Sequence, residues 1–80
     1  MADPRLTLVT RVGCHLCDVA KEVLVDVAAE TGETWREVDV DADAGLLDEY
    51  SDRVPVILLD GREHGYWRVE KARLIRDLLG

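Results

Sequence analysis

The sequence predicts an α/β fold in the order β-α-β-α-β-β-α, with a mixed four-stranded sheet and three helices. Segments with the alternating pattern of strands are separated by segments whose apolar residues recur at helical spacing. An Asp60-Gly61 pair between two strand-like segments is typical of a tight hairpin turn. Strands separated by helices are expected to pair in parallel and the hairpin strands antiparallel, which makes the sheet mixed.

The first half of the chain contains two predicted strands around one long helix. Residues 5–10 alternate leucines with polar positions, which indicates a strand. Residues 16–30 carry apolar side chains on one helical face and charged ones on the other, which predicts an amphipathic helix. Gly32 suits the left-handed conformation that ends helices. Residues 34–40 alternate again and predict the second strand.

The second half predicts a short helix, a hairpin and a final helix. The carboxylates in 41–43 suit the start of a short helix that reaches Tyr50. Residues 54–59 form an apolar, β-rich run, and the chain returns as a strand through 63–67. Residues 69–79 again show helical spacing and close the fold.

Length and charge restrict the class of protein. Eighty residues suffice for one domain, residues 1–80, and are too few for two. The formal net charge of −7 argues against nucleic-acid and anionic membrane partners, which require clustered Lys and Arg. The first residues contain no apolar signal-peptide segment, and no apolar run is long enough to span a bilayer. We therefore expect a cytoplasmic monomer with no nucleic-acid or membrane partner.

The Cys14-His15-Leu16-Cys17 motif at a strand-to-helix junction is the most informative feature. Spacing of i, i+3 in a first helical turn puts both sulfurs on one face, where a disulfide can form. The helix N-terminus favours a thiolate at Cys14, and Cys17, one turn later, is expected to be less exposed. Thiol–disulfide exchange needs a nucleophile and a resolving thiol, and these residues are the candidates.

Other uses of the cysteine pair stay open at this point. The two thiols could carry a soft metal such as copper(I), or each could bind an iron–sulfur cluster shared between subunits. They could also be small core residues. A closed zinc site needs four ligands, and the chain has two cysteines in all. We therefore assign no metal ligands.

Three aromatic residues outside the motif are given structural roles. His64 is expected on the surface of the hairpin rather than as a metal ligand. Trp35 is expected to cover the sheet rather than to line a substrate groove, and Trp67, which follows the hairpin, could do either.

The segment from Thr10 to Cys17, after a first strand, resembles the active-site segment of glutaredoxins and thioredoxins. The element order is similar to the compact glutaredoxin form over essentially the whole chain. The resemblance implies a thioredoxin-like fold and a redox-active disulfide between Cys14 and Cys17, the catalytic residues. The implied activity is that of an oxidoreductase that reduces protein or low-molecular-weight disulfides in cell redox homeostasis.

The resemblance also implies a substrate-binding region. Pro55 stands where the family has a cis-proline beside the cysteine pair, and Val54 would offer backbone hydrogen bonds to an extended substrate. Arg11 matches the basic residue that many glutaredoxins use near the glutathione carboxylate. The implied partners are a disulfide substrate and an electron donor. The donor would be a reductase or a thiol, either glutathione or another low-molecular-weight thiol, and no bound cofactor is implied.

The chain departs from the glutaredoxin pattern around the glutathione site. Arg53 replaces the usual Thr before the Val-Pro pair. The segment 65–68, Gly-Tyr-Trp-Arg, replaces two glycines and an acidic pair. Because these changes remove charge-assisted contacts, we expect poor activity on small glutathione mixed disulfides. Better activity is expected on a protein disulfide docked along Val54 and Pro55.

Overall fold

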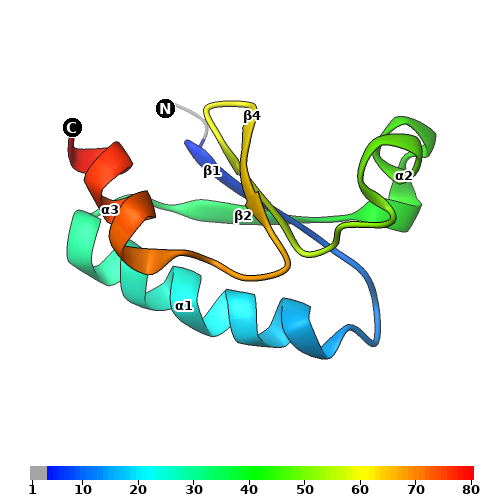
Figure 1. Ribbon diagram of the computed structural model, residues 1–80, viewed down its shortest axis with the longest axis horizontal. Coiled ribbons are helices and arrows are strands. Elements are labelled where there is room, and N and C mark those ends of the chain that lie inside the picture. The colour runs from blue at the N-terminus through cyan, green and yellow to red at the C-terminus, as the bar shows by residue number, and fades with distance from the viewer. Residues whose placement is uncertain (1–3) are drawn as a thin grey trace.

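The computed structural model describes residues 4–80 and arranges them in the predicted element order. The strands are β1 (Leu6–Thr10), β2 (Trp35–Asp39), β3 (Val56–Leu59) and β4 (Arg62–Tyr66). The helices are α1 (His15–Thr31), α2 (Ala44–Tyr50) and α3 (Lys71–Leu79), with a short 3-10 segment, η1 (Val40–Ala42), before α2. The predicted α/β class, with a mixed four-stranded sheet and three helices, is confirmed (Figure 1). The expectation that the first three residues carry no targeting segment lies outside the described residues.

The sheet has the order β2-β1-β3-β4, and one predicted pairing is wrong. β1 and β2 pair in parallel as expected, but β3 runs antiparallel to β1 although a helix precedes it. A parallel return needs a connection that crosses the length of the sheet. The seven residues of α2 rise only about 10 Å, and α2 stays at one end of the sheet (Figure 1). β3 therefore starts at the end where β2 finishes.

The central strand β1 separates two apolar clusters and is buried along its whole length. On one side, apolar residues of β1 and β3 pack against α1 and α3; the buried members are Leu6, Leu8, Ala20, Leu24, Val27, Ile57, Leu74 and Leu78. On the other side, Val9, Val40 and Val56 form a smaller cluster beneath residues of α2. The second face is thus covered at the end near α2, and Thr7 and Thr10 of β1 are buried as well, with their hydroxyls bonded to Arg36 and Glu37 of β2.

Local sequence signals fix the ends of several elements. Gly32 ends α1 with a φ of +76°, and Asp60 and Gly61 both have positive φ in the hairpin turn, as their sequence predicts. Asp39 and Asp43 accept backbone N–H groups at the starts of η1 and α2. Of the carboxylates predicted to start the short helix, Asp43 caps α2, whereas Asp41 lies within η1.

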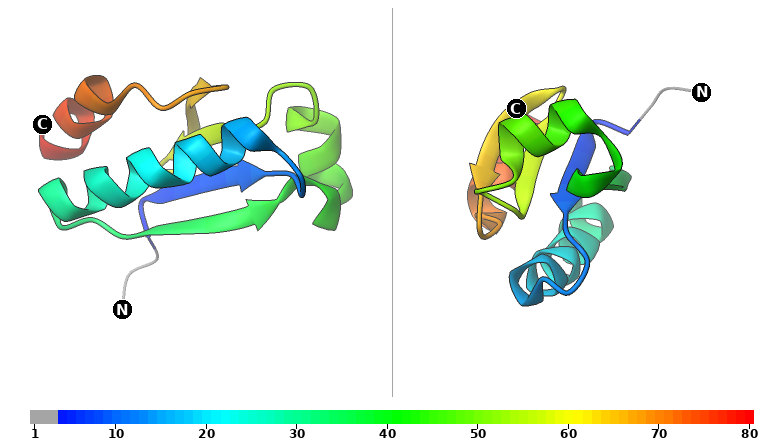
Figure 2. Two further views of the ribbon diagram at one scale, coloured as in Figure 1. Left: turned by 90° about the horizontal axis from the view of Figure 1, so that it is seen from below. Right: turned by 90° about the vertical axis from the view of Figure 1, so that its right-hand side faces the viewer.

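The helices α1 and α3 pack together at the end of the molecule away from α2. Figure 2 shows α3 beside the C-terminal half of α1, and Lys71 lies 2.9 Å from Glu30 across this contact. Within residues 4–80, no helix combines the length and the apolar character needed to cross a membrane.

Candidate active site

Cys14 is the N-cap of α1, the residue immediately before the first helical turn. The preceding turn contains Gly13 with a φ of +78°, which glycine adopts without steric cost. The N–H of Cys14 donates to the carbonyl of Arg11 at 3.2 Å and closes this turn. The turn brings Cys14 to the open end of α1, where N–H groups without helical partners favour negative charge.

Cys17 lies one helical turn behind Cys14 and is 1% exposed. Its backbone N–H donates to the Sγ of Cys14 at 3.2 Å, and both cysteines are free thiols. Burial raises the pKa of the Cys17 thiol to about 11, and a hydrogen bond with the Cys14 thiol acts in the same direction. Cys14 is only partly buried. The pair therefore consists of one accessible sulfur, held by a backbone amide, and one enclosed thiol behind it.

Pro55 lies at the end of the sheet where β1 leads into the turn that carries Cys14. Its peptide bond to Val54 is cis, as predicted, and its ring is buried. The next residue, Val56, pairs with Val9 of β1. Pro55 therefore flanks the end of β1, while the half-buried Val54 packs against the smaller apolar cluster.

Trp67 is hydrogen-bonded to Pro55 through its backbone and has a largely exposed side chain. Its backbone N–H donates to the Pro55 carbonyl at 2.7 Å, and its φ is +70°. The Trp67 side chain is 54% exposed, and the ring of Tyr66 meets it edge-on with 5.0 Å between centroids. Trp35 packs against the main core as expected, whereas Trp67, for which both roles were open, is largely exposed. The positive φ turns the chain away from the sheet after β4.

Arg11 points toward β2 rather than toward β3. Its guanidinium lies 3.4 Å from the carboxylate of Asp41, just after β2, in an exposed ion pair. Val54 and Pro55 lie on the other side of β1, where β3 begins. The structure thus places the cysteine turn and Pro55 at the same end of the neighbouring central strands β1 and β3, and it directs Arg11 to the opposite side of β1.

A polar pocket of about 300 Å³ lies on that side, behind the cysteine turn. The hydroxyl of Thr10 donates to the carboxylate of Glu37 at 2.7 Å, and the Lys21 ammonium lies 3.0 Å from the same carboxylate. These two contacts lower the pKa of Glu37. The sequence analysis did not predict this polar group of Thr10, Lys21 and Glu37. The signal was weak because Thr10 and Glu37 are 27 residues apart and meet only through the parallel pairing of β1 and β2.

Arg53, one of the departures from the glutaredoxin pattern, is held by its own surroundings. Its guanidinium lies 3.3 Å from Glu63 of β4 and 3.8 Å from Glu49 of α2, and it donates to the Glu49 carbonyl at 2.7 Å. The guanidinium also lies over the ring of Tyr50 at 5.7 Å. Arg53 therefore connects α2 to the hairpin.

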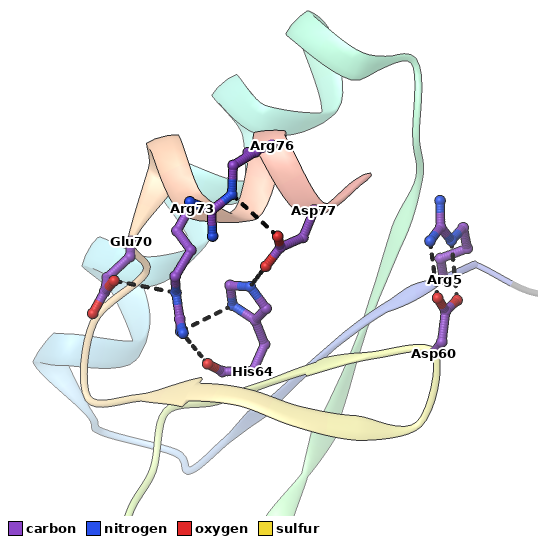
Figure 3. A network of polar contacts seen from close by, with 7 residues as sticks. All are labelled: Arg5, Asp60, His64, Glu70, Arg73, Arg76 and Asp77. Carbon is purple, nitrogen blue, oxygen red and sulfur yellow. Dashed lines mark hydrogen bonds and ion pairs between the residues drawn. The ribbon is translucent and has the colours of Figure 1, made fainter. Parts of the chain in front are cut away.

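His64 is not a surface residue of the hairpin, and that prediction is wrong. Its side chain is only 10% exposed, and its Nε2 lies 2.8 Å from the carboxylate of Asp77 on α3 (Figure 3). Arg73 donates to the backbone carbonyl of His64 from the same helix. The irregular pairing of β3 and β4 at this point turns the imidazole toward α3.

Metal-ligating side chains do not gather elsewhere in residues 4–80. Within this range no group of three or more His, Cys, Asp or Glu side chains is arranged to hold a metal ion. Cys14 and Cys17 together offer two sulfur atoms.

The fold and the cysteine pair at the start of α1 define a thioredoxin-like protein. Its sequence matches the model of the Glutaredoxin-like domain family (DUF836) over residues 5–79, so the chain belongs to that family.

Individual relatives support the same assignment. An uncharacterized protein of Mycobacterium tuberculosis is 43% identical over 83 residues, covering 98% of this chain and 86% of the relative. An X-ray structure of a Xanthomonas protein (X. campestris) has 40% identity and a TM-score of 0.73, covering 91% of this chain and 93% of that one. The thioredoxin of Fasciola hepatica shares the fold, with a TM-score of 0.56 at 22% identity, over 96% of this chain and 81% of that chain.

Proposed function

We propose that this protein is a dithiol–disulfide oxidoreductase that uses Cys14 as nucleophile and Cys17 as resolving thiol. The observation that carries the proposal is the 3.2 Å contact from the Cys17 N–H to the Cys14 Sγ at the N-terminus of α1. A backbone donor and the helix dipole both favour negative charge on that sulfur. A thiolate there is the species that attacks disulfides.

The reaction runs in two exchanges. The Cys14 thiolate attacks a substrate disulfide, forms a mixed disulfide and releases the first substrate thiolate, which takes a proton from water. Cys17 then loses its proton and attacks the Cys14 sulfur. The Cys14–Cys17 disulfide forms, and the second substrate sulfur leaves as a thiolate and is protonated. Two electrons pass from the dithiol to the substrate, and a thiol or a reductase returns them.

The substrate we propose is a protein disulfide. Trp67 and Leu16 are both about half exposed, and Val12 is 85% exposed. Val12 and Leu16 are each two residues from Cys14 along the chain, and the Trp67 backbone is hydrogen-bonded to Pro55, so exposed apolar side chains belong to both segments of the proposed docking region. Such side chains fit an extended polypeptide better than a small peptide thiol, whose recognition depends on its charges.

The electron donor and the compartment belong to the same proposal. Arg11 is paired with Asp41 and Arg53 with Glu49 and Glu63, so these cations are already engaged. Glutathione would have to compete with those carboxylates. We therefore infer that glutathione is a weak electron donor and that another thiol or a reductase supplies the electrons. We propose that the protein acts as a monomer. A dithiol that must be kept reduced fits the cytoplasm.

A redox titration of the purified protein tests the proposal. Samples are equilibrated in buffers of increasing oxidising strength, quenched with acid, alkylated and weighed by mass spectrometry. We expect the wild type to change reversibly from doubly alkylated protein to unalkylated protein that is two hydrogen atoms lighter than the dithiol, and we expect no such disulfide in Cys14→Ser or Cys17→Ser. Metal analysis of the same preparation separates this function from soft-metal or cluster binding. Two thiols that stay free in oxidising buffer would refute the proposal.

A further inference from the structure

Lys21 occupies a fixed position behind the cysteine pair. It follows Cys17 by four residues on α1, so the two side chains share one helical face. The Lys21 ammonium lies 3.0 Å from Oε2 of Glu37 on β2, and the buried hydroxyl of Thr10 donates to the same oxygen at 2.7 Å. The pair of contacts anchors this flexible side chain near the helical turn that carries Cys17.

The other charged groups around Lys21 lie on three elements. Asp18 of α1 is 3.9 Å away, Glu37 faces it from β2, and Asp39 and Arg11 line the same pocket. Arg11 forms its ion pair with Asp41, which does not line this pocket. Lys21 is therefore the cation of this pocket that shares a helical face with the enclosed thiol. Burial raises the pKa of Cys17, a hydrogen bond with the backbone of Arg11 lowers it, and the charge of Lys21 acts in the same lowering direction.

We propose that Lys21, anchored on Glu37, stabilises the Cys17 thiolate that resolves the mixed disulfide. This inference rests on the proposed dithiol exchange. In that step Cys17 loses its proton to water, its sulfur bonds to the Cys14 sulfur, and the substrate sulfur leaves with the electron pair and is protonated. An ammonium near Cys17 favours the charged form before the attack, and Glu37 keeps the ammonium from swinging into solvent.

The size of the effect follows from the chemistry of thiolates. Loss of a nearby positive charge on a partly exposed side chain changes the thiolate fraction by about tenfold or less at neutral pH. A more basic thiolate is also a better nucleophile, with a Brønsted coefficient of about 0.4–0.5, which recovers part of the loss. Resolution should therefore slow by roughly threefold when the charge is removed.

The resolving step can be timed with an uncharged dipyridyl disulfide and reduced protein in excess. Attack by Cys14 releases one absorbing thiopyridone, and attack by Cys17 on the mixed disulfide releases a second one in a unimolecular phase. We compare wild type, Lys21→Met, which removes the charge, and Lys21→Arg, which retains it. Lys71→Met is the matched control, because Lys71 pairs with Glu30 at 2.9 Å on the helix faces remote from the cysteines. Circular dichroism checks that each variant is folded.

We expect the second phase of Lys21→Met to be about threefold slower at neutral pH and its pH profile to move upward, with the first phase nearly unchanged. Lys21→Arg should restore both the rate and the profile, and Lys71→Met should match wild type. An unchanged second phase in Lys21→Met, failure of the Arg variant to restore it, or an equal effect in Lys71→Met would overturn the inference. Absence of a second phase in wild type would instead refute the oxidoreductase function itself.

Discussion

The backbone N–H of Trp67 donates to the carbonyl of Pro55 at 2.7 Å and joins the end of β4 to the residue just before β3. Because Val56 pairs with Val9, this bond also holds the backbone of Trp67 near the end of β1, where the cysteine turn begins. A large aromatic residue, 54% exposed, is thus held close to the start of β3.

Substitution Trp67→Ala should slow the reduction of a protein disulfide by about tenfold. Contact with a polypeptide would cover part of the exposed indole, and about 1–2 kcal/mol of lost apolar burial corresponds to that factor. The reaction with the small dipyridyl disulfide should not change, since it does not reach the indole. Leu79→Ala, at an exposed leucine on the far end of α3, serves as control. Equal slowing of both substrates would contradict a docking role for Trp67.

Alkylation should distinguish the two thiols of the reduced protein. Iodoacetamide reacts with thiolates, and burial raises the pKa of Cys17 to about 11, so this group stays protonated at neutral pH. We expect peptide mass mapping to find the label on Cys14 first, with Cys17 labelled only well above pH 9. Unfolded protein, labelled at both sites alike, is the control. Preferential labelling of Cys17 would reverse the assigned roles.

The variant Cys17→Ser should accumulate mixed disulfides through Cys14, since the resolving sulfur is gone. Non-reducing gels of a lysate treated with this variant should show covalent protein complexes that Cys14→Ser does not form.

In a parallel assay, wild type should reduce a glutathione mixed disulfide at least tenfold more slowly than a protein disulfide, because two charge-assisted contacts are replaced. Efficient glutathione-coupled turnover would show that Arg53 and segment 65–68 do not prevent glutathione use.

The contact between His64 and Asp77 should make stability depend on pH in the acidic range. A hydrogen bond from His64 lowers the pKa of Asp77, and Arg76 adds to the effect. The pKa of Asp77 in the folded protein lies below its value in the unfolded chain, about 3.9. The contribution of this contact to folding stability is therefore complete above that pH, and it disappears as the pH falls through the pKa of the folded state.

Asp77→Asn should therefore lower the Tm relative to wild type at pH 6, and this difference should shrink below about pH 4. Differential scanning calorimetry from pH 2 to pH 7 measures it. Asp48→Asn, at an exposed position of α2, should leave the curve unchanged. A Tm difference that is constant over the whole range would mean that the carboxylate charge of Asp77 does not contribute.

Local sequence signals predicted the order of the elements and the position of the cysteine pair at the start of a helix. Gly32 and the Asp60-Gly61 turn end elements through local backbone preferences, and the spacing of Cys14 and Cys17 follows from one helical turn. Such features depend on residues a few positions apart. They can be predicted because short-range geometry alone sets them.

How distant segments meet depends on the packing of the whole chain. β3 runs antiparallel to β1 because α2 is too short to cross the sheet, and the alternating pattern of a strand carries no direction. The bulge in β4 turns His64 toward Asp77, 13 positions away in the sequence. The parallel register of β1 and β2 brings Thr10 to Glu37, 27 positions away. Whether a polar side chain is buried depends on what packs over it. That packing is a property of the whole fold, which no single segment encodes.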